Sequence, residues 1–316
     1  MRFHMVVVAA ALSLASTVSA IEFRSQLLEL KLPDVTLRGT LEQPLTTERV
    51  PVALIVAGSG PTDRDGNSKL LPGANNSLKM LAQQLASNGI ASLRYDKRGV
   101  GESTWLQPDE SKLRIDSFVN DADAWAAELE RRGFAKPVLI GHSEGALLVT
   151  LLAQRRAVAG VVLIAGAGRS ADVLLQEQLQ KQAPHLLADS ARILAELKAG
   201  RLVADVPPSL AALYRPSVQP YMQSWLRRDP AVELGKLKVP VLTVAGGADI
   251  QVSAADAGAL AAVASVQALR IANMNHVLKA VAVGDSVMQQ RSYGDPALPL
   301  APELVPAVVS FVRSLP

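Results

Sequence analysis

The 316-residue chain contains no cysteine. This absence excludes a disulfide-stapled scaffold, a cysteine nucleophile, a lipid-modified N-terminal cysteine and thiolate metal sites. Dense blocks of basic residues are also lacking, because 32 Lys and Arg are interspersed with 29 Asp and Glu for a formal net charge of +3. No stripe of alternating aromatic and basic residues is present either. We therefore expect a solvated surface and no nucleic-acid partner.

Long apolar runs are scarce. The one at the N-terminus, residues 5–15, is shorter than the roughly 20 residues that a membrane-spanning helix needs. Arg2 and His4 precede it, and the small residues Val-Ser-Ala at 18–20 follow, which is the order of a secretory signal peptide over residues 1–20. We expect an exported protein, periplasmic or secreted as in a Gram-negative bacterium, with no stable membrane span after cleavage. The alternative is an uncleaved anchor or a cytosolic N-terminal helix.

The rest of the chain alternates short apolar runs with helical patterns. Two alternating segments, 22–32 and 35–42, predict an antiparallel pair at one edge of a sheet. Continuous Val-, Ile- and Leu-rich runs are typical of parallel strands buried on both faces. Such strands are expected at 52–57, 90–95, 137–140, 160–165, 239–245 and 266–271, and helices at 77–87, 115–132, 144–156, 254–263 and 301–315. This order predicts an α/β fold, with a mostly parallel central sheet flanked by helices.

One connection, residues 169–238, is too long for this alternation. A helical pattern covers residues 172–198, and the segment after it is broken by Pro207, Pro208, Pro216 and Pro220. We expect a helical cap or lid over 169–238, inserted into one catalytic domain made of residues 21–168 and 239–316. Chain length alone would equally suit two independent domains.

The pentapeptide Gly141-His142-Ser143-Glu144-Gly145 lies between an expected strand and an expected helix. In a G-x-S-x-G sequence at such a junction, the Ser occupies a tight, strained turn that lifts its hydroxyl above the sheet edge. Both flanking positions must be small for the backbone to close. The motif predicts that Ser143 is a nucleophile, and the alternative is an ordinary strand-to-helix turn with an idle Ser.

A Ser hydroxyl needs a base at neutral pH, and His is the usual one. Beyond the leader the chain has His142, His185 and His276. The elbow turns His142 away from the hydroxyl, and His185 falls in the expected cap. His276 follows the run 266–271, level with the strand ends. Elimination therefore predicts His276 as the base.

The imidazole needs a carboxylate that fixes its tautomer and stabilises its positive charge. In this architecture the chain order is Ser, then the acid, then His. Asp249 stands after the buried run 239–245 and the turn at Gly246-Gly247, so we predict that it is the acid. Asp256 is the competitor, and we expect it to be a solvated helix residue.

Ester or amide cleavage also needs two N–H donors for the oxyanion. The backbone N–H of Glu144, at the start of the helix, is one candidate. The other is the N–H of Ser59, in the Gly-rich segment 58–61 after the strand 52–57. A phosphate-binding loop is the rival interpretation, but this segment lacks the spacing of a dinucleotide or P-loop motif.

Two further groups of residues surround this expected site. In the cap, Tyr214, Tyr221 and Trp225 are candidate substrate-binding residues for an acyl pocket, although aromatics at such spacing are more often helix-packing residues. The charged turn 63–67 does not fit a calcium loop. It is expected to brace the oxyanion loop through an ion pair, or to form a polar turn.

Together these segments resemble a serine hydrolase of the α/β-hydrolase superfamily. The chain is most similar to exported bacterial carboxylesterase-like proteins, grouped with dienelactone hydrolases and serine aminopeptidase-like hydrolases. The resemblance runs from about Leu37 to the C-terminus and rests on the segments 58–66, 94–103, 141–145, 246–249 and 275–276. It implies an oxyanion donor at Ser59 and a triad of Ser143, Asp249 and His276.

The function we expect is cleavage of a small-molecule carboxylic ester through an acyl-enzyme, with no metal and no organic cofactor. The same triad would also serve amide or peptide hydrolysis, as in aminopeptidase-like relatives, or acyl transfer to an alcohol. A non-catalytic binding protein on a hydrolase scaffold is the alternative of a different class. The sequence leaves the oligomeric state open.

Overall fold

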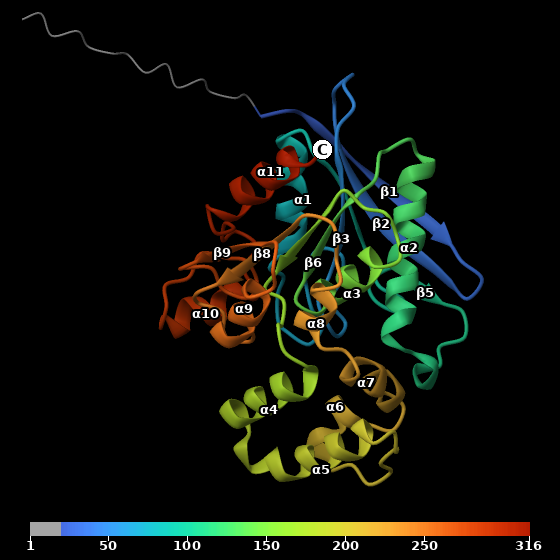
Figure 1. Ribbon diagram of the computed structural model, residues 1–316, viewed down its shortest axis with the longest axis vertical. Helices are drawn as coiled ribbons and strands as arrows, with labels where there is room; N and C mark the ends of the chain where they lie inside the picture. The colour runs from blue at the N-terminus through green and yellow to red at the C-terminus, as the bar shows by residue number, and fades with distance from the viewer. Residues whose placement is uncertain (1–19) are drawn as a thin grey trace, which may run out of the picture.

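The protein is built on one central sheet. Its strand order is β1-β2-β4-β3-β6-β7-β8-β9, with β5 paired to β2 (Figure 1). The structure is a computed structural model that describes residues 20–316, so the expected signal peptide lies outside the described residues except for Ala20. The strands are β1 (Phe23–Lys31), β2 (Val35–Pro44), β3 (Val52–Val56), β4 (Ala91–Tyr95), β5 (Thr104–Trp105), β6 (Val138–His142), β7 (Gly160–Ile164), β8 (Val241–Gly246) and β9 (Val266–Ile271).

β2 runs opposite to its neighbours β1, β4 and β5. β1, β2 and β4 pair antiparallel, whereas β4, β3, β6, β7, β8 and β9 run parallel to one another. Every residue of β3, β4, β6 and β7 is buried, as expected for strands covered on both faces. The predicted edge pair and the predicted parallel strands are confirmed, with bounds that differ by one or two residues.

Helices cover both faces of the sheet. One hydrophobic core joins it to α2 (Ile115–Arg131), α3 (Glu144–Ala153), α8 (Pro230–Leu234) and α9 (Ala254–Ala261). A second core joins its other face to α1 (Ser77–Ser87) and α11 (Leu304–Ser314). The short α10 (Ser286–Ser292) precedes α11 and was not expected from the sequence. Within residues 20–316, no helix is both long and apolar enough to cross a membrane.

Between β7 and β8 the chain forms α4 (Ala171–Gln182), α5 (Leu187–Lys198), α6 (Ala211–Tyr214), α7 (Gln219–Leu226) and α8. Helices α4–α7 share a hydrophobic core of their own and form a layer set apart from the sheet (Figure 1). The expectation of a single helical segment over 172–198 is wrong, because Pro184 begins a 3-10 turn that separates α4 from α5. Proline lacks the N–H that would continue α4. That these helices act as a lid stays a prediction.

Ion pairs hold the long loop after β3 against β4. Arg64 Nη1 lies 2.7 Å from Asp96 Oδ2, and Arg94 Nε lies 2.8 Å from Asp65 Oδ1. Asp96 is 2% exposed, and burial raises the pKa of its carboxyl group although Arg64 and two backbone N–H groups oppose the rise. The bracing ion pair expected of segment 63–67 is therefore present.

Candidate active site

Ser143 occupies a strained turn where β6 ends and α3 begins. Its backbone has φ 55° and ψ −121°, a region that costs a residue with a side chain on the order of 1–3 kcal/mol. A Cβ on Gly141 would lie 2.3 Å from the carbonyl oxygen of Gly145, and a Cβ on Gly145 would lie 2.2 Å from that of Val56. The turn therefore closes only with glycine at both positions, as the pentapeptide predicted.

The side chains of Ser143, His276 and Asp249 lie in a row. His276 Nε2 is 3.2 Å from Ser143 Oγ, and His276 Nδ1 is 2.9 Å from Asp249 Oδ2. An imidazole that donates its Nδ1 proton to the carboxylate leaves Nε2 free to accept the Ser143 proton. The structure thus brings together the three residues that the sequence singled out.

Asp249 is held in its ionised form. Burial opposes ionisation, but the charge of His276, the hydrogen bond to its ring and two backbone N–H groups outweigh it and lower the pKa of Asp249. Those N–H groups belong to Gln251 and Val252, which donate to Asp249 Oδ1 over 2.8 and 2.9 Å. The carboxylate is therefore an acceptor with a fixed orientation.

Neighbouring strands position the acid and the base. β8 and β9 are adjacent and parallel, so the loops at their carboxyl ends meet. The N–H of Gly247 donates to the carbonyl of Ile271 over 2.8 Å, and that of Ala248 to Met274 over 3.0 Å. These two bonds tie the acid loop to the loop that carries His276.

The other two histidines have different surroundings. His142 is buried, and its Nε2 lies 2.8 Å from the backbone carbonyl oxygen of His276. Burial, and then the neighbouring His276, lower the pKa of His142 to about 4, so its neutral ring donates to that carbonyl. Sequence reasoning excluded His142 as the base but missed this support of His276. His185 is exposed in the turn between α4 and α5.

The expectation that Asp256 is a solvated helix residue is wrong. Its side chain is fully buried and accepts hydrogen bonds from Ser253 Oγ over 2.7 Å and from Arg169 Nη2 over 2.8 Å. Asp256 and Ser253 form a capping box at the N-terminus of α9, in which the side chain of each accepts from the backbone N–H of the other. Because Arg169 precedes α4, this ion pair anchors the start of the cap to the N-terminal turn of α9.

The two expected oxyanion donors belong to segments that lie beside Ser143. Glu144 begins α3 directly after it. A Cβ on Gly58 would lie 3.0 Å from Ser143 Cβ, so the Gly-rich loop after β3 passes beside the nucleophile. Within residues 20–316, the backbone N–H of the next residue, Ser59, has no hydrogen-bond acceptor. It is free to bind an oxygen atom of a substrate.

Comparison with known proteins agrees with this arrangement. A family model described as "Serine aminopeptidase, S33" matches residues 74–278, which is more than half of the chain. The chain belongs to this family. The protein described as "Esterase EstD" from Thermotoga maritima is 31% identical over 226 residues. These residues cover 70% of the chain described here and 52% of that relative. The chain thus spans about half the length of the curated relative that it matches.

Solved structures show the fold of this S33-family member. The α/β-hydrolase GrgF from Penicillium sp. sh18 superposes with a TM-score of 0.60 at 16% identity, covering 92% of this chain and 98% of its own. The enol-lactonase from Burkholderia xenovorans LB400 gives a TM-score of 0.55 at 19% identity, covering 91% of this chain and 100% of its own. The fold is the α/β-hydrolase fold, with its helical cap inserted after β7.

The S33-family chain has a buried polar cluster beside Gly58 and Glu144 that the sequence did not predict. Lys97 Nζ donates to the carbonyl oxygen of Gly58 and lies 3.4 Å from Glu144 Oε2. The hydroxyl of Tyr221, on α7, donates to Glu144 Oε1. Lys97 belongs to the segment 94–103, which contributed to the family resemblance without a role for this lysine.

The three aromatic residues expected to bind substrate are placed differently. Tyr214 is fully buried in the cap core with its hydroxyl 2.7 Å from Ser190 Oγ, so its expected role is corrected to packing. Tyr221 and Trp225 are partly buried between the cap core and the core around α3, with ring centroids 6.1 Å apart. Burial, followed by the adjacent Glu144, raises the pKa of Tyr221.

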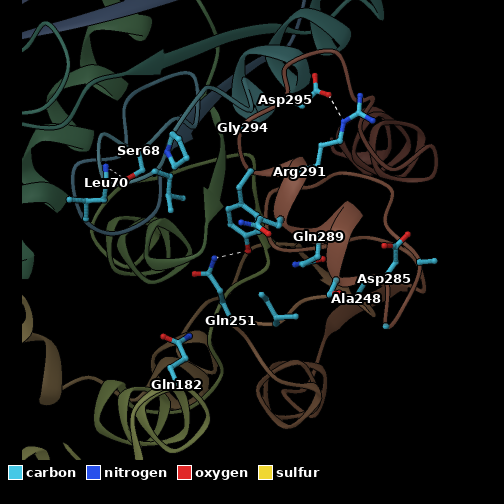
Figure 2. Close-up of a pocket in the computed structure, with 18 of the residues that line it drawn as sticks. Ser68, Leu70, Gln182, Ala248, Gln251, Asp285, Gln289, Arg291, Gly294 and Asp295 are labelled. Atoms are coloured by element: carbon cyan, nitrogen blue, oxygen red, sulfur yellow. Dashed lines mark hydrogen bonds and ion pairs between the residues drawn. The ribbon is translucent and has the colours of Figure 1, made fainter.

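A cleft of about 1160 Å³ lies beside the acid loop (Figure 2). Its walls come from α4, the loop after β8, α10 and residues 68–72. Ala248 and Gln251, on either side of the Asp249 backbone, line it, whereas Ser143 and His276 do not. The cleft therefore extends away from the reacting atoms on the acid side.

Amide and hydroxyl groups dominate the polar lining of this cleft. Gln251 Nε2 donates to the Tyr293 hydroxyl over 2.8 Å, and Gln289, which is 9% exposed, has no partner for its Nε2 among the residues that the structure describes (Figure 2). Arg291 pairs with Asp295 over 2.8 Å. Asp285 also lines the cleft, so the lining carries an excess of negative charge and does not favour an anionic group.

Proposed function

We propose that this chain is a serine hydrolase that cleaves small-molecule carboxylic esters through an acyl-enzyme. The observation that carries the proposal is the row of Ser143, His276 and Asp249 at hydrogen-bond distances, with Ser143 on a strained elbow. The name of the esterase relative supports the ester as substrate.

In this mechanism Ser143 Oγ attacks the acyl carbon while His276 Nε2 takes its proton. Asp249 stabilises the imidazolium that forms. The N–H groups of Ser59 and Glu144 bind the oxygen of the tetrahedral intermediate, each contributing a factor of about 10²–10³ in rate. His276 then gives the proton to the leaving alkoxide, and water releases the acyl group by the same steps.

The surroundings of Ser143 favour an ester over the amino-terminal amide of a peptide. An aminopeptidase needs a carboxylate that is available to the free ammonium group of its substrate. Glu144, the carboxylate next to Ser143, is buried and already bonded to Lys97 and Tyr221. The cleft beside Asp249 is lined by Asp285, Asp295 and Arg291, so it favours a neutral ester over an anionic one.

A panel of activated esters of graded chain length, run beside aminoacyl amides, tests this function. We expect ester turnover by the wild type, none by Ser143→Ala, and neutral esters to be preferred over anionic ones. A fluorophosphonate probe should label the wild type and the surface variant His185→Ala but not His276→Ala. Turnover by Ser143→Ala would refute the mechanism, and preference for amides would replace the esterase by an aminopeptidase.

We also propose that residues 1–20 direct export and are then removed. The basic, apolar and small-residue regions of that segment support this. Expression in a Gram-negative host should give a periplasmic protein whose N-terminal residue is Ile21, as measured by mass spectrometry. A full-length protein confined to the cytosol would refute the proposal.

A further inference from the structure

A buried chain of hydrogen bonds runs from the cap to the loop beside Ser143. It consists of the Tyr221 hydroxyl, the Glu144 carboxylate, the Lys97 ammonium and the Gly58 carbonyl. Lys97 is 2% exposed and Glu144 is 8% exposed. Charges buried to this degree persist only when they are paired and hydrogen-bonded, so each member depends on the next.

The contact of Lys97 with Gly58 acts on an oxyanion donor. In a planar trans peptide the C=O of one residue and the N–H of the next point in opposite directions. A bond that fixes the Gly58 oxygen therefore also fixes the direction of the Ser59 N–H. The ammonium charge polarises the same peptide group and makes that N–H a stronger donor.

The contact of Lys97 with Glu144 reaches the second donor. The backbone N–H of Glu144 follows the nucleophile directly, and its side chain extends to Lys97 and Tyr221. An unpaired carboxylate here would oppose the negative charge that develops on the substrate oxygen. Lys97 and Tyr221 offset that charge, so one small cluster serves both donors.

The cluster also connects two layers of the fold. Tyr221 lies on α7, and its ring meets the ring of Phe118 on α2 edge to face, with centroids 5.8 Å apart. Lys97 Nζ lies 5.5 Å from the centre of the Phe118 ring. Aromatic packing thus holds the Tyr221 hydroxyl at Glu144 Oε1 and the Lys97 ammonium at Glu144 Oε2.

We propose that Lys97 is a positioning residue for the oxyanion hole and that Tyr221 couples this hole to the cap. The inference rests on the proposed esterase function. In this scheme Lys97 and Tyr221 do not touch the substrate. They keep the N–H groups of Ser59 and Glu144 aimed at the oxygen before the substrate binds, and α7 must be in place for the chain of bonds to be complete.

Lys97→Met tests the first part, because it keeps the length of the side chain and removes the charge. We expect kcat for an activated ester to fall by about 10²-fold, the effect of one oxyanion donor, with KM within about twofold. Affinity for a trifluoromethyl ketone, whose adduct with Ser143 places an oxyanion in the hole, should fall by a similar factor. Lys112→Met, which alters a lysine side chain that is 80% exposed, is the control and should behave as the wild type.

The double variant Lys97→Met/Glu144→Gln separates the two contacts of Lys97. It leaves no unpaired buried charge, so it should fold even if Lys97→Met does not. Because the Gly58 carbonyl still lacks its partner, we expect kcat and inhibitor affinity to stay low. Recovery of wild-type values in this variant would overturn the role of Lys97 at Gly58.

Tyr221→Phe tests the coupling to the cap. Loss of the hydroxyl should lower kcat several-fold and leave KM unchanged, because the hydroxyl is bonded to Glu144 and not to substrate. A higher KM with unchanged kcat would make Tyr221 a substrate-binding residue and overturn the coupling. Wild-type kcat and inhibitor affinity in Lys97→Met would refute the inference alone, whereas absence of ester turnover by the wild type would refute the proposed function itself.

Discussion

Adding one methyl group at Gly145 should damage both stability and activity, whereas the same change at Gly258 should not. The Cβ of an alanine at position 145 would lie 2.2 Å from the carbonyl oxygen of Val56 and 2.9 Å from that of Ala57. Ordinary contacts between carbon and oxygen are about 3.3 Å or longer. The start of α3 or the end of β3 would therefore have to move by about 1 Å. Since the clashing atoms belong to the backbone, rotation of a side chain cannot relieve the contact.

The expected magnitudes depend on this shift. Overpacking of a tight site costs about 1–3 kcal/mol of stability, and a displacement of about 1 Å near reacting groups reduces the rate by about 10²-fold. Gly258, on the exposed face of α9, has no atom within 4 Å of the position that a methyl group would take. Gly258→Ala should therefore gain about 0.5–1 kcal/mol through helix propensity.

Thermal unfolding and ester kinetics on the two variants measure these effects. One kcal/mol corresponds to a shift of about 2–4 °C in the melting temperature for a chain of comparable size. We expect Gly145→Ala to melt several degrees below the wild type with a much lower kcat/KM, and Gly258→Ala to melt slightly above it with unchanged kinetics. Equal melting temperatures and rates for the two variants would refute the steric account of the elbow.

Three further variants probe the surroundings of the triad. Asp249→Asn should lower kcat by roughly 10⁴-fold, because the imidazole loses its orienting carboxylate; a loss below tenfold in stopped-flow assays would contradict this role. The pKa of His142 is about 4 in the fold against an ordinary value of 6.5, so the unfolded chain binds more protons between these values and stability falls as pH drops from 6.5 towards 4. At pH 5 the loss is about 2 kcal/mol at 1.36 kcal/mol per pKa unit, and urea unfolding at pH 7.5 and pH 5 should show a smaller difference for His142→Asn than for the wild type or the exposed His185→Asn. Arg169→Met leaves the buried Asp256 without its cation and should cost about 3–5 kcal/mol in urea unfolding; adding Asp256→Asn should restore part of it, and no loss in the single variant would show that Ser253 and the backbone N–H groups of residues 168 and 169 suffice.

Local sequence patterns predicted the fold well where the conformation of a segment is determined by the residues within that segment. The helix expected at 77–87 has the bounds of α1, and each parallel strand lies on its apolar run. The turn at 141–145 depends on glycine at fixed positions, so the sequence contains the signal directly. The split between α4 and α5 was missed because Pro184 sits inside an otherwise continuous helical pattern.

Contacts between distant segments were not predictable from those patterns. Lys97 and Glu144 are 47 residues apart, and Tyr221 is 77 residues from Glu144. The burial of Asp256 likewise depends on Arg169, which is 87 residues away. A charged or aromatic residue in a loop or helix looks the same in the sequence whether it faces solvent or a partner that the fold brings to it.

The backbone of Ser143 has a consequence for how this fold can be stabilised. Its φ of 55° and ψ of −121° suit a glycine better than any residue with a side chain. The residue that we propose as the nucleophile is thus one at which a smaller residue would relax the backbone. Selection of variants for heat resistance alone should therefore recover proteins that have lost the nucleophile, and a screen for robust variants needs turnover as a second criterion.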